Sequence, residues 1–138
     1  MDNCVICRIV KNEIPNAKIY EDKDVLAILD IRPATKHGGH VLVFPKKHFE
    51  LIYEIPDNLL AKIIFTVKRI SKALLKFGEG LNILQNNKRI AGQAISHVHF
   101  HLIPRFKNDG ITVEKWTTNE YKSGEKEKVA SKIKSLLK

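Results

Sequence analysis

The sequence predicts an α+β fold in which five short strands accompany one long helix and a short helix at the N-terminus. The length is one reason, because 138 residues fit a single domain. Hydrophobic residues make up 43% of the chain and charged residues 28%, which suits one buried core and excludes a disordered chain. One long segment repeats apolar residues at helical spacing, whereas shorter apolar runs are bounded by turn residues. We therefore interpret 1–138 as one domain, in which 107–138 form a polar, basic C-terminal tail.

The short helix lies at the start of the chain. Asn3 can cap it, and the turn at 14–16 closes it. Its apolar positions are Val5, Ile6, Ile9 and Val10. Cys4 and Cys7 are one turn apart and therefore share a face of this helix.

Three strands are predicted next. Residues 18–21 and 25–29 form a hairpin, because the polar residues 22–24 between them are typical of a tight turn. A loop with two adjacent glycines leads into the third strand, 40–44, which Pro45 is expected to end.

The long helix follows Pro56. Asp57 can cap it and Gly78 follows its last residue, with apolar positions at Leu60, Ile63, Ile64, Val67, Ile70, Leu74 and Phe77. Two more strands are predicted at 81–85 and 97–103, the second ended by Pro104. The tail is expected to contain a narrow amphipathic helix with apolar positions at Val129, Ile133, Leu136 and Leu137.

Charge and composition exclude several classes of protein. No apolar run reaches the roughly 20 residues of a membrane-spanning helix, and no basic segment marks an export signal, so a cytoplasmic protein is expected. The only cysteines, Cys4 and Cys7, do not suggest a disulfide framework. Lys and Arg outnumber Asp and Glu by 24 to 15, which favours phosphate-bearing partners. Few aromatic residues interleave with the basic ones, so we expect no nucleic-acid surface and no membrane contact.

Three histidines alternate with apolar residues along the last predicted strand, in the order His97, Val98, His99, Phe100, His101 and Leu102. On a strand the imidazoles share one face, about 6.6 Å apart, while the apolar side chains anchor the other face on the core. Three aligned histidines are costly as core filler, because each buried ring nitrogen needs a partner. The row therefore indicates a functional site.

Two chemistries fit this row. A neutral imidazole can attack phosphorus and form a covalent intermediate, with its neighbours binding the anionic oxygens. Alternatively, three imidazoles can hold zinc with an open coordination position. Small residues and amides near the row, including Gly92, Gln93, Ser96 and the two glycines before His40, favour phosphate chemistry.

With these residues the sequence resembles the histidine-triad family of nucleotide hydrolases and transferases. The resemblance extends from Cys4 to about Arg105 and includes the segments Glu13-Ile14-Pro15, Leu29-Asp30-Ile31, His40-Val41-Leu42-Val43-Phe44-Pro45-Lys46-Lys47-His48 and Gly92-Gln93. Within the family it is most similar to the bacterial-type branch with paired N-terminal cysteines that cleaves purine nucleoside phosphoramidates. The resemblance implies one five-stranded antiparallel sheet with the long helix packed on it, extended by a second copy in a homodimer.

The resemblance also implies a reaction. His99 would attack the nucleotide phosphorus, His101 would hold the phosphate oxygens, and His40 matches a family histidine beside the triad. The products would be a nucleoside monophosphate and an amine, formed through a nucleotidyl-histidine intermediate. A dinucleoside polyphosphate hydrolase and a non-catalytic nucleotide-binding regulatory protein remain alternatives.

Nucleotide-binding residues can be matched in the same way. Asp30 matches the acidic residue that binds the ribose hydroxyls. Asn86 and Gln93 match polar groups near the phosphate and leaving group, with Gly92 and Ala94 on either side of Gln93. The apolar walls of the base pocket match Ile31, Ile28, Ile6 and Ile9. An ordinary core position remains an alternative for Ile6 and Ile28.

Ala94 departs from the family pattern, because many relatives carry a serine there that contacts the phosphate. One hydrogen bond is worth about 1 kcal/mol, or roughly fivefold in rate. We therefore expect the chain to have reduced or differently tuned activity and not to be inactive.

Cys4, Cys7, His48 and His97 form a second constellation. Two sulfur and two nitrogen donors with no open position are the pattern of a structural zinc site, and equivalent residues bind zinc in the resembled branch. Two buried thiols without metal remain the alternative for the cysteine pair. If zinc binds, His97 is structural. The resemblance assigns no role to His37, and it implies that tail residues reach toward a partner subunit's active site.

Overall fold

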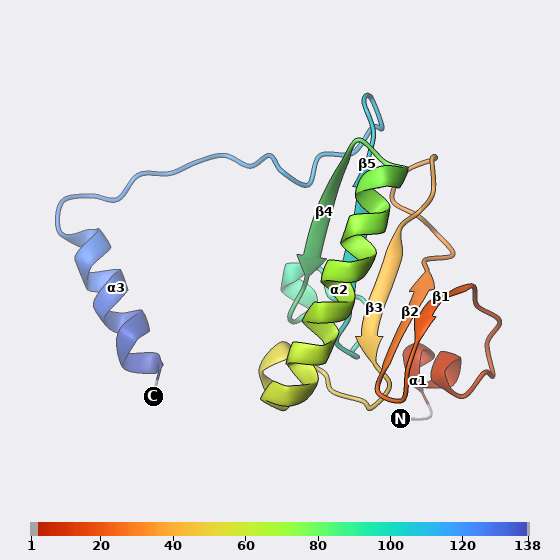
Figure 1. The fold of residues 1–138 in the computed structure, drawn as a ribbon. Coiled ribbons are helices and arrows are strands. Elements are labelled where there is room, and N and C mark those ends of the chain that lie inside the picture. The colour runs from red at the N-terminus through yellow and green to blue at the C-terminus, as the bar shows by residue number, and fades with distance from the viewer. Residues whose placement is uncertain (1–2, 138) are drawn as a thin grey trace.

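The computed structural model describes residues 3–137 and contains one five-stranded sheet (Figure 1). Its strands are β1 (Lys18–Glu21), β2 (Val25–Leu29), β3 (Val41–Pro45), β4 (Gly80–Gln85) and β5 (Phe100–Arg105). They lie in the order β1-β2-β3-β5-β4, and all neighbouring pairs are antiparallel. The helices are α1 (Val5–Val10), α2 (Asp57–Phe77) and α3 (Glu125–Leu136), with single 3-10 turns at Ile52–Glu54 and Arg89–Ala91. The predicted α+β fold is confirmed.

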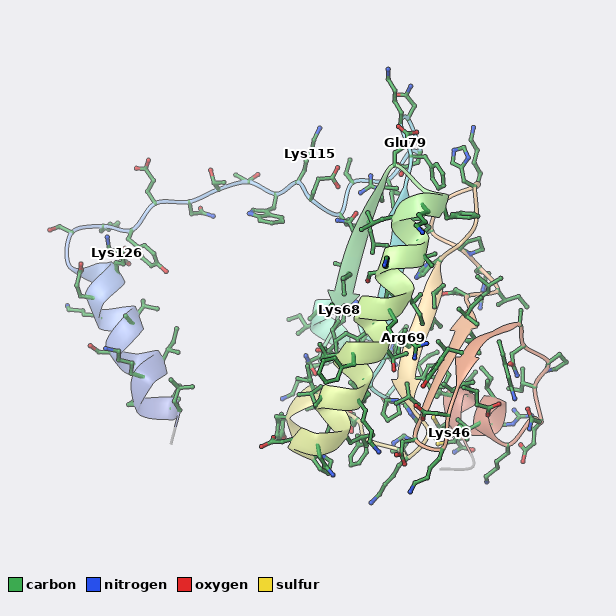
Figure 2. The ribbon with its side chains drawn as sticks, in the orientation of Figure 1. Lys46, Lys68, Arg69, Glu79, Lys115 and Lys126 are labelled. Carbon is green, nitrogen blue, oxygen red and sulfur yellow. The ribbon has the colours of Figure 1, made fainter. Side chains whose placement is uncertain are left out.

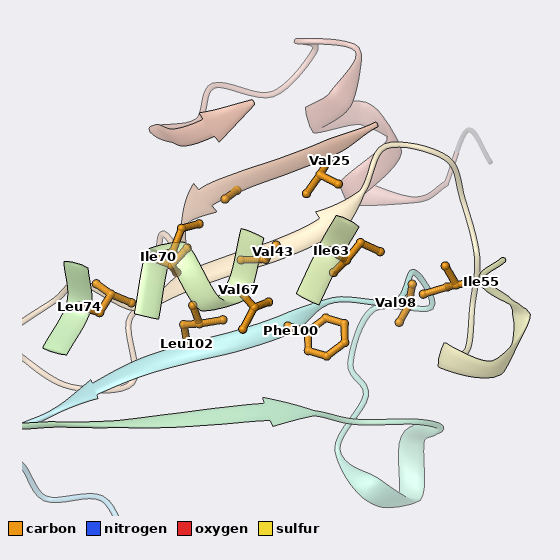
Figure 3. Packing of buried hydrophobic residues seen from close by; sticks show 12 residues of the cluster. Val25, Val43, Ile55, Ile63, Val67, Ile70, Leu74, Val98, Phe100 and Leu102 are labelled. Carbon is orange, nitrogen blue, oxygen red and sulfur yellow. The ribbon is translucent and has the colours of Figure 1, made fainter. Parts of the chain in front are cut away.

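The long helix α2 covers one face of the sheet (Figure 3). Its helical spacing buries Ile63, Val67, Ile70 and Leu74. They pack on side chains from β2, β3 and β5 and from the segment before β5, namely Val25, Ala27, Val41, Val43, Val98, Phe100 and Leu102. The apolar side chains that alternate with the histidines therefore anchor this segment on the core, as the sequence pattern predicts.

The start of α2 corrects one prediction. Pro56, with an extended backbone at φ −57° and ψ 143°, is the residue at the N-cap, so Asp57 does not cap the helix. Asp57 instead occupies the first turn, where its carboxylate interacts favourably with the positive end of the helix dipole. The helix ends at Phe77, and Gly78 is the C-cap.

The short helix α1 packs on the opposite face of the sheet. Ile6 and Ile9 join a second buried cluster with Leu26, Ile28, Leu42 and Phe44. Cys4, and not the predicted Asn3, is the N-cap, and its Sγ accepts a hydrogen bond from the Cys7 backbone N–H at 3.4 Å. The Cys4 thiol therefore caps the helix in place of the predicted side-chain amide of Asn3.

The triad segment enters the sheet later than predicted, because β5 begins at Phe100 and not at His97. The Val98 backbone N–H donates to the Phe49 carbonyl at 2.7 Å instead of to a sheet neighbour. His97 and His99 therefore lie in a connecting segment beside the end of β3.

Pro45 is the last residue of β3 and so ends that strand as predicted, whereas Pro104 lies inside β5, which continues to Arg105 and corrects the second prediction. Proline lacks a backbone N–H and is tolerated where a strand has an unpaired side. The β3–β5 pairing runs only from Val43 opposite Phe100 to Val41 opposite Leu102, so both prolines lie beyond it. Each pairs only on its other side, Pro45 with Val25 of β2 and Pro104 with Leu81 of β4.

An arm leaves the sheet at the end of β5, and Arg105 holds its first residues. The guanidinium donates to Asp109 at 2.7 Å, Asn82 at 2.7 Å, Glu114 at 3.0 Å and the Ile111 carbonyl at 2.7 Å. The arm then extends away from the sheet and ends in α3 (Figure 1). Residues 114–137 are all exposed.

Basic side chains come from many parts of the chain. Figure 2 labels Lys46 after β3, Lys68 and Arg69 on α2, Lys115 on the arm and Lys126 on α3. Within residues 3–137 no helix has the length and apolar character needed to cross a bilayer.

The α2 core contact predicts a measurable difference between neighbouring residues. Ile63 is 0% exposed and Ile64 is 45% exposed. Ile63→Ala is expected to lower the free energy of unfolding by about 3 kcal/mol, because it leaves a cavity in the core. Ile64→Ala is the matched control and is expected to cost less than about 1 kcal/mol. Urea unfolding of both variants measures the difference, and equal losses would contradict the packing.

Candidate active site and metal cluster

The starts of β3 and β5 bring the three predicted catalytic histidines together. His40 directly precedes β3, His99 directly precedes β5, and His101 lies in β5 opposite Leu42. The ring centroids of His99 and His101 are 4.8 Å apart, and those of His40 and His101 are 5.2 Å apart. Asp30 follows β2, and its backbone N–H donates to the His40 carbonyl at 2.8 Å.

The backbone fixes the protonation pattern of His99. Its Nδ1 lies 2.7 Å from the His97 carbonyl oxygen, which can only accept a hydrogen bond. Nδ1 therefore carries the proton, and Nε2 of the neutral ring has a free lone pair. Within residues 3–137 no hydrogen bond to this Nε2 is formed. Such a nitrogen is a nucleophile.

His40 and His101 form a hydrogen-bonded pair beside His99. His40 Nε2 lies 3.0 Å from His101 Nδ1, and the Asp30 carboxylate lies 3.9 Å from the same His40 nitrogen. Burial lowers the pKa of His40, although Asp30 opposes this effect. Burial, helped by the neighbouring His99 and His40 rings, lowers the pKa of His101 to about 4. Both rings are therefore neutral at pH 7.

The predicted base-pocket isoleucines do not share one environment. Ile6, Ile9 and Ile28 are buried together between α1 and the sheet. Ile31 is 88% exposed at the start of the loop after Asp30. Asp30 itself is half-buried, and one of its carboxylate oxygens accepts the Arg32 backbone N–H at 2.9 Å.

Gln93 is 5% exposed, and both ends of its amide are occupied. Its Oε1 accepts the Lys88 N–H at 2.7 Å, and its Nε2 donates to the Glu50 carbonyl at 2.7 Å. Gln93 therefore fixes the loop between β4 and β5. In that loop Gly92 has a left-handed backbone with φ 98°, and a Cβ on Gly92 would lie 3.4 Å from Asn86 Nδ2. Ala94 is exposed.

The second predicted constellation is also assembled. Cys4 Sγ and Cys7 Sγ lie 3.4 Å and 3.6 Å from His97 Nδ1, and Cys7 Sγ lies 3.4 Å from His48 Nδ1. All four ligand atoms lie within 4.8 Å of one another, so the cluster could hold a metal ion. Both cysteines are free thiols.

His97 is oriented for such a site. It is 0% exposed, and its Nε2–H donates to the Pro45 carbonyl at 2.8 Å. The lone pair is therefore on Nδ1, facing the two sulfurs. Burial lowers the pKa of His97 to about 4 and raises the pKa of the Cys7 thiol, with Cys4 raising the latter further.

Asp30, His40 and His101 are also close enough to hold a metal. However, the Ala34 backbone N–H donates to His40 Nδ1 at 3.1 Å. A neutral His40 therefore has its proton on Nε2, between the two rings. We interpret this group as a hydrogen-bonded pair. Ala34 acts through its backbone, so no sequence pattern could have identified it.

His37 lies outside both groups. Its ring packs on Phe106 with centroids 4.3 Å apart, and the residue is exposed. Trp116 and Tyr121 are exposed on the arm. The structure brings neither His37 nor these tail residues to the described histidines of this chain.

The structure is thus an α+β domain that carries two polar clusters at the ends of its central strands, one with His40, His99 and His101 and one with the Cys/His ligands. A family match to the HIT domain covers residues 11–108. The chain belongs to the HIT family.

Relatives match between three quarters of the chain and nearly all of it. The Bacillus subtilis protein named Hit is 43% identical over 99% of this chain and 95% of its own length. A Candida albicans protein named adenosine 5′-monophosphoramidase is 44% identical over 75% of this chain and 70% of its own length. A crystal structure of a HIT family member from Bacillus subtilis superimposes with a TM-score of 0.90 at 40% identity, covering 99% of this chain and 98% of that one. HIT-family hydrolases are thus among its relatives at about 40% identity.

Proposed function

We propose that the chain is a hydrolase that cleaves the P–N bond of purine nucleoside phosphoramidates. The observation that carries the proposal is the His99 ring, whose Nδ1–H is held by the His97 carbonyl while Nε2 keeps its lone pair beside His101. The fungal relative named as a phosphoramidase supports the choice of substrate.

The reaction has two steps. His99 Nε2 attacks the phosphorus, the P–N bond to the amine breaks, and the amine leaves with that electron pair and takes up a proton. Water then attacks the phosphorus, gives up a proton and breaks the bond to His99, which releases the nucleoside monophosphate. The His97 carbonyl accepts from Nδ1–H throughout, and so stabilises the positive charge on the ring in the intermediate.

The remaining site residues bind the nucleotide in this proposal. Asp30 receives the ribose hydroxyls, and His101 donates to the phosphate oxygens. The loop with Asn86, Gly92 and Ala94 faces the phosphate and leaving group, and Gln93 holds that loop in place through its two backbone contacts. The base lies against the exposed Ile31, whereas Ile6, Ile9 and Ile28, predicted as further walls of the base pocket, are buried between α1 and the sheet.

A substrate panel tests the proposal. Adenosine 5′-phosphoramidate is expected to be hydrolysed faster than diadenosine polyphosphates, and rapid quenching with mass spectrometry is expected to find adenylate on His99. Faster cleavage of the polyphosphates would assign the chain to the alternative hydrolase class. Binding of adenosine monophosphate with no covalent adduct and no turnover would reject an enzyme and support a nucleotide-binding regulatory protein.

We further propose that the metal in the Cys/His cluster is zinc with a structural role. Tetrahedral zinc places sulfur and nitrogen ligands roughly 3.5 Å apart, given Zn–S and Zn–N bonds of about 2.3 and 2.0 Å. The observed sulfur–nitrogen distances of 3.4 to 3.6 Å match this value. Bound zinc would lower the thiol pKa values and tie α1 to β3 and β5, leaving no coordination position for a reactant.

Metal analysis checks the zinc proposal. The purified chain is expected to contain about one zinc per chain by mass spectrometry of the metal. Cys7→Ser is expected to lose it, because the hydroxyl is a poor zinc ligand. His37→Ala changes a histidine outside the cluster and is expected to retain it. A metal-free wild-type chain that also binds no added zinc would contradict the proposal.

We also propose the homodimer that the resemblance implies, in which a second copy extends the sheet, and we propose that this copy also covers α3. An isolated 12-residue helix is marginal in water, yet every described residue of α3 is exposed, including Val129, Ile133, Leu136 and Leu137. Light scattering is expected to give a dimer mass for the full chain and a lower mass for a chain ending at residue 115. A monomeric full chain at micromolar concentration would contradict this arrangement.

A further inference from the structure

The proton positions in the histidine pair follow from one backbone amide. A neutral imidazole has one nitrogen that donates and one that accepts. The Ala34 backbone N–H donates to His40 Nδ1, with the two nitrogens 3.1 Å apart, and an amide N–H can only donate. His40 Nδ1 is therefore the accepting nitrogen, and the ring proton of His40 is on Nε2.

The proton on His40 Nε2 in turn determines the tautomer of His101. His40 Nε2–H lies 3.0 Å from His101 Nδ1, so His101 accepts at Nδ1. His101 is neutral at pH 7 because burial lowers its pKa to about 4, and it carries one ring proton. That proton is therefore on Nε2, the nitrogen at the other side of the ring.

We propose that Ala34 is a positioning residue whose backbone N–H, acting through His40, holds His101 in the tautomer that donates from Nε2. The part that concerns phosphate rests on the proposed function. An anionic phosphate oxygen accepts a hydrogen bond from Nε2–H, whereas the opposite tautomer would turn a lone pair toward the same oxygen.

The loop from Ile31 to Gly39 holds this amide in place. Its two ends are joined where the Asp30 N–H donates to the His40 carbonyl at 2.8 Å, and the Gly38 N–H donates to the Thr35 carbonyl at 3.1 Å. Gly39 lies so close to α2 that an added Cβ would stand 2.5 Å from Phe77 Cε1, at a φ of 80°. The loop is therefore packed on α2, and the Ala34 amide needs no reorganisation to reach His40.

Two replacements of Ala34 distinguish the role of its backbone N–H from that of its methyl side chain. Ala34→Pro removes the N–H, whereas Ala34→Gly keeps it and is the matched control. Nitrogen-15 NMR of the ligand-free protein reads the tautomer of each histidine ring directly. Wild type and Ala34→Gly are expected to show His101 protonated at Nε2, and Ala34→Pro is expected to shift it toward Nδ1–H. An unchanged His101 tautomer in a folded Ala34→Pro chain would overturn the proposal.

A second variant removes the same N–H without the ring of proline, which could itself disturb the loop. A semisynthetic chain with lactate in place of Ala34 has an ester instead of the amide and otherwise the same shape. It is expected to show the same shift of His101 and to bind adenosine monophosphate about fivefold to tenfold more weakly. His101 remaining at Nε2–H in the ester chain would overturn the proposal. Because the spectrum needs no substrate, a failure of the phosphoramidase assignment would be seen separately, in the turnover assays.

Discussion

Replacing His99 by alanine is expected to lower the turnover of adenosine 5′-phosphoramidate by at least about a thousandfold, which corresponds to roughly 4 kcal/mol of barrier. The change removes the only atom proposed to form a bond to phosphorus. His101 and Asp30 would still bind the nucleotide, so the dissociation constant for adenosine monophosphate is expected to change much less than kcat. Steady-state kinetics and titration calorimetry measure the two quantities.

His37→Ala is the control for this experiment, because that histidine is exposed and lies outside the site. It is expected to keep near-normal turnover. His99→Ala with near-normal turnover would reject His99 as the nucleophile. A parallel loss in both variants would show that the loss does not come from the site.

Acid is expected to destabilise the protein between about pH 6.5 and 4.5. The pKa values of His97 and His101 are about 4 in the folded chain, below the ordinary value of 6.5 that applies when it is unfolded. The unfolded chain therefore binds more protons in this window, so the stabilising contribution is complete above pH 6.5 and is lost as pH falls toward 4. A shift of this size is worth about 3 kcal/mol for buried His97 and less for the partly exposed His101.

Urea unfolding at several pH values, with a chelator present to keep metal off His97, measures this loss. Ion-paired carboxylates add to the loss of stability only at lower pH. The Arg105 guanidinium holds the pKa of Asp109 well below its usual value, so the stability from this pair is lost only below about pH 4. His101→Gln is expected to show a shallower decline than wild type. A stability that stays constant from pH 6.5 to 4.5 would contradict the buried neutral histidines.

The sequence was sufficient to predict features that depend on local periodicity. The apolar pattern predicted the long helix between Pro56 and Gly78, although with Asp57 as its cap, and the turn residues predicted the β1–β2 hairpin with its bounds. The Asp22 carboxylate explains that turn, because Oδ1 accepts the backbone N–H groups of Asp24 and Val25 at 2.7 and 2.8 Å. The resemblance to the histidine-triad family also predicted the Cys/His cluster, whose four residues lie together.

Features that depend on distant segments were not predictable from the pattern. The alternation of histidines suggested a strand from His97, but the chain before Phe100 bonds to Phe49 instead of to the sheet. Pro104 was expected to stop its strand, but it lies beyond the register of β3 with β5 and pairs with Leu81 of β4, so β5 continues to Arg105. The proton positions on His40 and His99 depend on the Ala34 amide and the His97 carbonyl, which carry no side-chain signal.

The exposed α3 has a thermodynamic consequence. If its apolar side chains are covered only by another chain, mass action links folding of the tail to protein concentration. Dilution would then melt α3 first and leave the sheet intact, so that helical content falls at concentrations where the aromatic signal of the core is unchanged. The helical content of the tail would thus vary with protein concentration, while the sheet and its histidines stay folded.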